Sequence, residues 1–284
     1  MKRYSLWTVL LLVVVLAVVG YLQYREAAHE TPGASTAQPL PETAPEPRYP
    51  IPAPATVPET DAAADTGGEP SDLEDTAEPL PTLNRSDPPV MSVLAGILGA
   101  EPLRELFRLD EFIRRFVVTV DNLPRKKLPQ RQLVAKPVAG SFLARPAEAD
   151  GAAGEDVWMI DPDNAARYTP YVRLATALDS ERLVAFYVRY YPLFQEAYTE
   201  LGYPTAYFND RLVEVIDHLL QTPTVDGPVR LVRPHVFYQY ADPELEALSA
   251  GQKTLLRMGG TNAEQIKIAL RALRDALTRA PAAE

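Results

Sequence analysis

Residues 180–220 read SERLVAFYVRYYPLFQEAYTELGYPTAYFNDRLVEVIDHLL, and this stretch decides the fold class. Apolar and aromatic side chains recur every three or four positions, which is typical of amphipathic helices. We expect one long helix that is kinked at Pro192 and ends at Gly202, followed by a second helix from about Tyr207 to Leu220. Two neighbouring helices of this length predict a mainly α domain.

Shorter elements surround these two helices. Residues 148–156 separate two apolar runs and predict a β-hairpin. The remaining expected elements are a helix with a capped start at Ser86-Asp87-Pro88, a helix over about 103–120, short strands over 229–232 and 236–240, and a last helix from a capping box at 261–264 to about Thr278. The sequence therefore predicts a compact helical C-terminal domain over residues 86–280 with a few short β-strands.

The N-terminal residues predict a membrane anchor. Residues 4–24, YSLWTVLLLVVVLAVVGYLQY, carry no charge, and a helix of this length spans about 31 Å, close to the thickness of a hydrocarbon core. Lys2 and Arg3 precede the span, so the positive-inside bias places the N-terminus in the cytoplasm. We expect residues 1–25 to anchor the chain in the cytoplasmic (inner) membrane by one pass, with the domain periplasmic or otherwise extracytoplasmic.

A cleaved signal peptide is the alternative for this segment. Such peptides have an apolar region of about 7 to 15 residues followed by a small-x-small cleavage site. Here the apolar run is longer, and Arg25 and Glu26 occupy the upstream small-residue positions of the nearest alanine pair. The pattern favours an uncleaved anchor.

Residues 26–85 predict a disordered linker. Half of the chain's 28 prolines lie between Pro32 and Pro89, and residues 26–90 hold 13 acidic and two basic residues. A segment with few large apolar residues cannot offset its ordering entropy by burial. We expect a plain spacer that reaches between roughly 45 Å as a coil and roughly 190 Å if fully extended. Spacings such as Pro47 to Pro50 leave open a docking motif.

Composition excludes several classes of function. The chain has no cysteine, which excludes disulfides, thiolate catalysis and cysteine-ligated metals. The net charge of -10 comes almost entirely from the linker, so the nearly neutral domain gives no case for nucleic-acid binding. No phosphate-binding loop, nucleophile elbow or metalloprotease motif is present, and we assign no cofactor and no metal.

The second of the two central helices carries an acidic stripe. Asp210, Glu214, Asp217 and His218 fall on the face opposite to its apolar residues. Two or three carboxylates beside an imidazole are suited to acid–base catalysis or a weak divalent-cation site. A solvated helix face, with Arg211 paired to a neighbouring carboxylate, is the simpler interpretation and is favoured.

Two other groups of residues are candidates for partner binding. Nine aromatic residues lie between Phe186 and Phe208, and among them Tyr187, Tyr191 and Tyr198 would form a binding surface if exposed; their helical spacing favours a core stripe instead. Residues 114–136 carry a net charge of +6, with Arg125, Lys126, Lys127 and Arg131 at the centre. This basic segment is suited to anionic head groups, a wall polymer, an acidic partner or the protein's own linker, although a solvated loop is the simplest interpretation.

Long stretches of the domain resemble one bacterial family. They are IRRFVVTVDNLPRKKLP (113–129), ARYTPYVRLATALDSERLVAFYVRYYPLFQEAYTELGYPTAYFNDRLVEVIDHLLQTP (166–223) and VRLVRPHVFYQYADPELEALSAGQKTLLRMG (229–259). They resemble the family known as domain of unknown function 3014, whose members share an N-terminal anchor and a variable proline-rich spacer. The resemblance implies no activity, substrate or catalytic residue.

Three classes of function remain. A tethered binding or scaffold module in the cell envelope is favoured, because a long tether raises effective concentration while permitting search. The alternative is a tethered envelope hydrolase that uses the acidic stripe, for which no separate nucleophile or acid is recognisable. A transmembrane sensor is disfavoured by a cytoplasmic part of about three residues. The expected partners are the lipid bilayer, through residues 4–24, and an unknown envelope protein or wall polymer.

Overall fold

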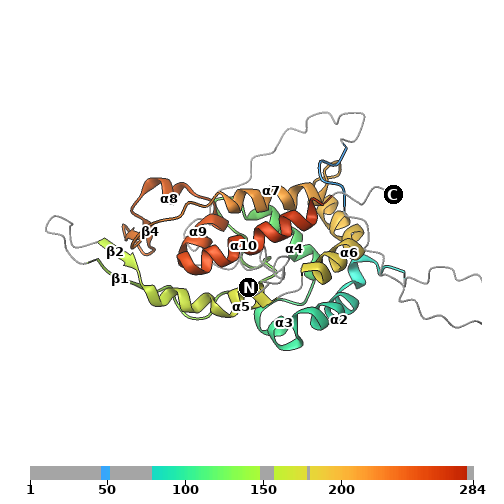
Figure 1. Cartoon of the computed structure of the whole chain (residues 1–284), viewed down its shortest axis with the longest axis horizontal. Helices are drawn as coiled ribbons and strands as arrows, with labels where there is room; N and C mark the ends of the chain where they lie inside the picture. The colour runs from blue at the N-terminus through green and yellow to red at the C-terminus, as the bar shows by residue number, and fades with distance from the viewer. Residues whose placement is uncertain (1–45, 52–78, 148–156, 178–179, 280–284) are drawn as a thin grey trace, which may run out of the picture.

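The computed structural model describes residues 46–51, 79–147, 157–177 and 180–279 (Figure 1). These residues form a mainly helical domain with a few antiparallel strands, which confirms the predicted fold class. In chain order the helices are the 3-10 helix η2 (Leu83–Arg85), α2 (Asp87–Leu98), α3 (Ala100–Leu106), α4 (Phe112–Asn122), the 3-10 helix η3 (Pro162–Tyr168), α5 (Thr169–Ala177), α6 (Ser180–Glu200), α7 (Phe208–Leu220), α8 (Pro243–Ala247), α9 (Ala250–Arg257) and α10 (Gly260–Leu277).

The core lies where α4, α5, α6, α7 and α10 pack together. At its centre the ring of Phe116 from α4 lies edge-on to Phe194 of α6 and Phe208 of α7, with centroids 5.4 and 6.2 Å apart. The rings of Phe194 and Phe208 stack at 5.9 Å. All three side chains are fully buried, so aromatic burial fixes the relative positions of the two helices predicted from residues 180–220.

Helices α6 and α7 agree with the predicted boundaries within one residue. Helix α6 continues through Pro192 and ends before Gly202, whose φ of 112° is a conformation that favours glycine. Asp179 lies outside the described residues, so the predicted cap is not seen. Helix α7 begins one residue after Tyr207.

A small antiparallel sheet packs beside the helices. Its strands are β1 (Ala144–Pro146), β2 (Val157–Ile160), β3 (Arg230–Val232) and β4 (Gln239–Tyr240), and they pair in that order. The pairing of β1 with β2 confirms the predicted hairpin, while its tip at 148–156 lies outside the described residues. The pairing of β3 with β4 confirms the second pair of strands. Leu231, Tyr240 and Leu256 form a separate small core beneath this sheet.

Helix α2 begins at Asp87, as predicted, but no side chain caps it, and the single helix predicted over 103–120 is wrong. Phe107 is extended and bridges Ala135, so the helix expected from about 103 to 120 is divided into α3 and α4. The carboxylate of Asp87 accepts hydrogen bonds from the backbone N–H groups of Glu111 (2.7 Å) and Phe112 (3.0 Å), so it caps α4 across the fold. Ser86 instead donates to the carbonyl of Leu83.

The predicted capping box at 261–264 is also wrong. Helix α10 begins at Gly260 without a side-chain cap. The capping box is one helix earlier, where Ser249 and Gln252 exchange hydrogen bonds at the start of α9. The pattern of Ser followed three residues later by Gln was present in the sequence, but α9 is too short to show a clear apolar period.

Parts of the predicted linker have defined structure. Residues 46–51 contact the domain, and η2 begins at Leu83. The predicted membrane span at 4–24 and the rest of the linker lie outside the described residues. Among the residues that the structure describes, no helix combines the length and apolarity needed to cross a membrane.

The start of α9 approaches α4 and α7 so closely that only glycine fits. A Cβ added to Gly251 would lie 2.7 Å from Leu219 Cδ2 and 3.0 Å from the carbonyl oxygen of Leu123. We expect Gly251→Ala to lower the free energy of unfolding by about 1–3 kcal/mol, since one obstructing atom belongs to the backbone. The measurement is urea denaturation followed by circular dichroism.

Gly96 is the matched control, because it also lies inside a helix and an added Cβ would meet no atom within 4 Å. Gly96→Ala should raise the free energy of unfolding by about 0.5–1 kcal/mol through helix propensity alone. Equal stability of the Gly251→Ala variant and the natural chain would contradict the described packing.

Candidate functional site

Helix α7 presents the predicted acidic stripe opposite a fully buried apolar face. Leu212, Val215, Ile216 and Leu219 are fully buried, whereas the stripe residues are half-buried. The side-chain amide of Gln195 organises the start of the helix. Its Oε1 accepts hydrogen bonds from Phe208 N and the Tyr191 hydroxyl, both at 2.9 Å, and its Nε2 donates to the carbonyl of Ala206.

A short piece of the linker, bent at Arg48 and Tyr49, is bound at this start of α7. Residues 46–51, EPRYPI, are called the docked segment below (Figure 1, blue). Asp210 accepts hydrogen bonds from two of its backbone N–H groups, those of Arg48 (3.0 Å) and Tyr49 (2.8 Å). Asn209 Nδ2 donates to the carbonyl of Tyr49 at 2.9 Å. Two consecutive side chains of α7 thus bind the main chain of the segment.

Side chains of the docked segment add an ion pair and apolar contacts. The guanidinium of Arg48 lies 2.5 Å from Glu214 Oε1, four residues along the stripe from Asp210. Arg211 lies 3.6 Å from the other carboxylate oxygen of Glu214. Tyr49 and Ile51 pack against the main core. The arrangement therefore has separate places for the main chain, one cation and two apolar side chains.

The second half of the stripe holds the domain together. Asp217 accepts hydrogen bonds from Nε and Nη2 of Arg274 on α10, at 2.5 and 3.2 Å. His218 Nε2 lies 2.9 Å from Ser249 Oγ at the start of α9. Burial and, after it, the nearby charge of Arg211 lower the pKa of His218, so the imidazole is neutral at pH 7. Asp217 and His218 have structural partners rather than a shared open site.

The stripe therefore does not form the constellation that a hydrolase requires. Each of its carboxylates is engaged by an arginine or by backbone N–H groups. Among the described residues, no group of three or more acidic or histidine side chains is placed to hold a metal ion. General acid–base catalysis needs carboxylates that converge on a cavity, and the two cavities described below are lined by other residues.

A buried carboxylate next to this face was missed by the sequence analysis. Asp121, at the end of α4, has 2% of its surface exposed. Its Oδ1 accepts from Arg211 Nε at 3.1 Å, and its Oδ2 accepts from Arg125 Nη2 at 2.5 Å. The hydroxyl of Tyr203 lies 3.4 Å from the same Oδ2. Asp121 thus joins α4 and α7 to the loops that follow α4 and α6.

Part of the basic segment at 114–136 binds groups of the protein itself, and Asp121 is one of them. Arg125 binds Asp121, and Nζ of Lys126 donates to the carbonyl of Ala247. The backbone carbonyl of Arg131 accepts a hydrogen bond from Arg115, at 2.7 Å. Lys127 also has an interaction partner. Arg125 and Lys126 therefore bind the protein itself, and the linker contact that the structure describes is made on the acidic α7 face instead.

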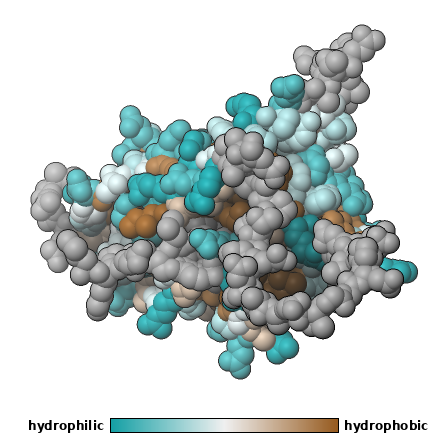
Figure 2. Space-filling view, turned by 45° about the vertical axis from the view of Figure 1, so that its right-hand side comes forward, coloured by the Kyte–Doolittle hydropathy of each residue, from teal (hydrophilic) through white to brown (hydrophobic). Residues whose placement is uncertain are grey.

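The aromatic candidates belong mainly to the core. Tyr187 and Tyr198 are buried, which favours the core interpretation and removes both as surface contacts. Burial raises the pKa of Tyr191 and of Tyr198 to about 12. Tyr187 still supports the docked segment indirectly, because its hydroxyl donates to Asn209 Oδ1 at 3.2 Å and orients that amide. The coloured surface in Figure 2 is mostly hydrophilic, with separate small apolar patches.

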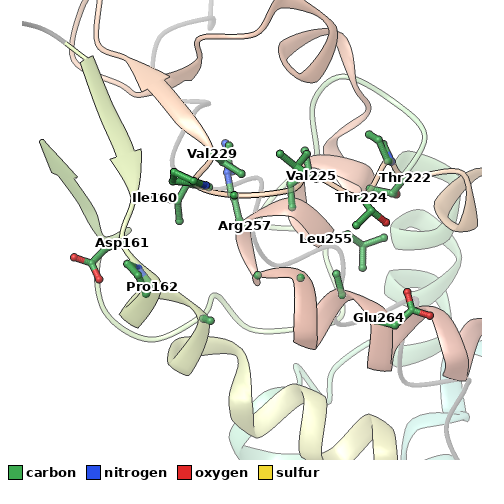
Figure 3. Close-up of a pocket in the computed structure, with 18 of the residues that line it drawn as sticks. Ile160, Asp161, Pro162, Thr222, Thr224, Val225, Val229, Leu255, Arg257 and Glu264 are labelled. Carbon is green, nitrogen blue, oxygen red and sulfur yellow. The ribbon is translucent and has the colours of Figure 1, made fainter. Parts of the chain in front are cut away.

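Two cavities near the sheet share Arg257 in their linings. The larger, of about 610 Å³, lies between the sheet, the loop after α7 and helices α9 and α10. Figure 3 shows Ile160 and Val229 on one side of it and Val225 and Leu255 on the other. The smaller, of about 390 Å³, is lined by residues that include Phe142 and Tyr238.

These features define the class of protein: a mainly α domain with a four-stranded antiparallel sheet and a segment of the preceding chain bound on one helix. The model of the family described as a protein of unknown function, DUF3014, matches residues 112–274. The match covers more than half of the chain, which therefore belongs to this family, as the resemblance indicated. No curated protein and no solved structure matches the chain.

Replacement of the buried carboxylate tests its role in the fold. We expect Asp121→Asn to lower the free energy of unfolding by about 2–3 kcal/mol, because Arg211 and Arg125 would lose a charged acceptor. Asp226→Asn, which removes an exposed loop carboxylate, is the matched control and should stay within about 0.5 kcal/mol of the natural chain. The measurement is thermal and urea unfolding, and equal effects of the two substitutions would contradict the assignment.

Proposed function

We propose that this protein is a single-pass, membrane-anchored cell-envelope protein whose domain is a peptide-binding module. Residues 4–24 form the anchor, the N-terminus lies in the cytoplasm, and the domain lies outside the cytoplasmic membrane at the end of the linker. The α7 face is the binding site, and its occupants are short, proline-flanked segments that carry an arginine and bend at the bound residues. The docked segment is the observation that carries this proposal.

The contacts resemble those of general peptide recognition. Main-chain hydrogen bonds supply affinity, while places for individual side chains supply specificity. Asn209 and Asp210 serve the first role and Glu214 serves the second. Pro47 and Pro50 flank the two residues that are bound, and prolines restrict the backbone, which reduces the entropy that a peptide loses on binding. The hydrolase alternative has no comparable support, because the stripe carboxylates are already bound.

The docked segment would act as a ligand within the same chain. Its ion pair is solvent-exposed, with side-chain exposures of 68% for Arg48 and 39% for Glu214, so it contributes at most about 1 kcal/mol. The ion pair is therefore weak, and the main-chain hydrogen bonds to Asp210 contribute more. The linker adds to docking because it keeps the segment near the site at an effective concentration in the millimolar range. A partner that carries a similar segment can displace it.

A labelled peptide tests this proposal directly. The peptide EPRYPI should bind weakly to the full natural chain in nanodiscs, because residues 46–51 compete with it. It should bind at least about tenfold more tightly when the chain's own segment is weakened by Arg48→Ala and Tyr49→Ala. Fluorescence anisotropy of the peptide is the measurement.

Further substitutions locate the bound peptide. Adding Asp210→Ala to the double variant should reduce affinity about tenfold or more, through loss of hydrogen bonds to a charged acceptor. Asp226→Asn in the same background is the matched control and should leave affinity unchanged. Absence of peptide binding by every variant, or binding that does not depend on Asp210, would refute the peptide-binding proposal.

The proposed topology has its own test, which the absence of cysteine makes simple. A cysteine at Thr66→Cys should react with a membrane-impermeant maleimide in spheroplasts. A cysteine inserted after Met1 should react only after lysis. The reverse pattern would contradict the orientation, and a mature chain that lacks residues 1–25 by mass spectrometry would establish the signal-peptide alternative.

A further inference from the structure

Lys267 of α10 is a buried cation beside the larger cavity. The residue has 7% of its surface exposed, and its Nζ donates a hydrogen bond to the carbonyl of Thr222 at 2.6 Å. Among the described residues no carboxylate lies within ion-pair distance of this ammonium. An ammonium has three donors, and a buried charge is costly unless it is compensated. No described carboxylate therefore neutralises this ammonium.

The cavity next to this ammonium has an apolar wall. Ile160 and Val229 from the sheet side face Val225 and Leu255, as Figure 3 shows. Its volume of about 610 Å³ lies in the range of small-molecule sites, which are mostly apolar with a few placed polar groups. The apolar wall predicts that a ligand of this cavity is mostly apolar. Lys267 predicts that one end of the ligand carries an anionic group.

The acidic residues of the lining do not neutralise Lys267. The carboxylate of Asp161 accepts the backbone N–H of Asp163 and so caps η3, and in Figure 3 it points away from the cavity. Glu264 is exposed and pairs with Arg271 at 3.2 Å. The lining also includes Arg145 and Arg257. The local charge therefore favours an anion over a neutral ligand.

We propose that this cavity binds a small amphipathic anion, with a single apolar chain along Ile160, Val225 and Leu255 and a carboxylate or similar group at Lys267. The site is independent of the α7 face, since the two share no residues. The proposal adds a small-molecule ligand to the peptide of the previous subsection and does not depend on it.

Photoaffinity labelling of the full chain in isolated membranes tests the proposal. A single-chain fatty acid with a diazirine in the chain is the probe, and mass spectrometry measures adducts on peptides that contain residues 222–229 and 255–267, relative to adducts elsewhere on the chain. We expect these adducts to dominate. Decanoate should compete with the probe, whereas neutral decanol at the same concentration should not.

Three variants and a control identify the groups involved. Lys267→Met should reduce the specific adducts about tenfold or more, because a hydrogen bond between charged groups is lost. Lys267→Arg keeps the charge and should retain them. Thr224→Trp, in the exposed loop that lines the cavity, should block the site without disturbing the helices. Arg104→Met, on the exposed side of α3, is the matched control and should have no effect.

Several results would overturn the proposal. They are equal competition by decanol, adducts that persist in Lys267→Met or Thr224→Trp, and adducts spread evenly over the chain. Equal labelling of the same peptides by a two-chain phospholipid probe would also overturn it, because the cavity volume suits a single chain. If Lys267→Met fails to fold, as judged by circular dichroism, Thr224→Trp and the competition experiment still decide the outcome.

Discussion

The geometry of the α7 face depends on the hydrogen bonds that the buried carboxylate of Asp121 accepts from arginines. This carboxylate holds the guanidinium of Arg211, which also donates to the backbone carbonyl of Asp121 at 3.0 Å. Arg211 in turn lies 3.6 Å from Glu214, and Glu214 binds Arg48 of the docked segment. A buried charge fixes geometry because any displacement leaves it uncompensated. One aspartate at the end of α4 thus sets the position of a recognition group on α7.

The strengths of the contacts explain why an acidic linker docks on an acidic helix face. Hydrogen bonds from backbone N–H groups to the Asp210 carboxylate contribute roughly 1.5–3 kcal/mol each, more than the exposed ion pair. Contacts of Tyr49 and Ile51 with the core add apolar burial. The net charges of the linker and of the helix face therefore do not determine where the segment binds. Arg48 pairs with Glu214, so the docked segment brings a positive charge, and not a further carboxylate, to this part of the helix face.

The sequence predicted the elements that have a strong period and missed those that depend on distant partners. Helices α6 and α7 follow from the spacing of aromatic and apolar residues. The cap on α4 could not be predicted, because Asp87 is 25 residues from Phe112. The sequence also could not show that Glu214 binds Arg48 while Asp217 binds Arg274, because both arginines lie outside α7. A signal for the docked segment was nevertheless present: an arginine beside Tyr49 and Ile51, in a linker with few large apolar residues.

Helix α7 joins the two proposed sites, and its packing bears on whether they communicate. Its 13 residues span about 20 Å between the docked segment at one end and Thr222, beside the larger cavity, just after the other. Energetic coupling requires an element with two arrangements of similar energy. The apolar face of α7 is fully buried, and Asp217 fixes the helix to α10 through Arg274. A helix held in this way is expected to stay in place when either site is occupied. The peptide and the amphipathic anion should therefore bind additively, so the tests of the two sites report on separate properties of the domain.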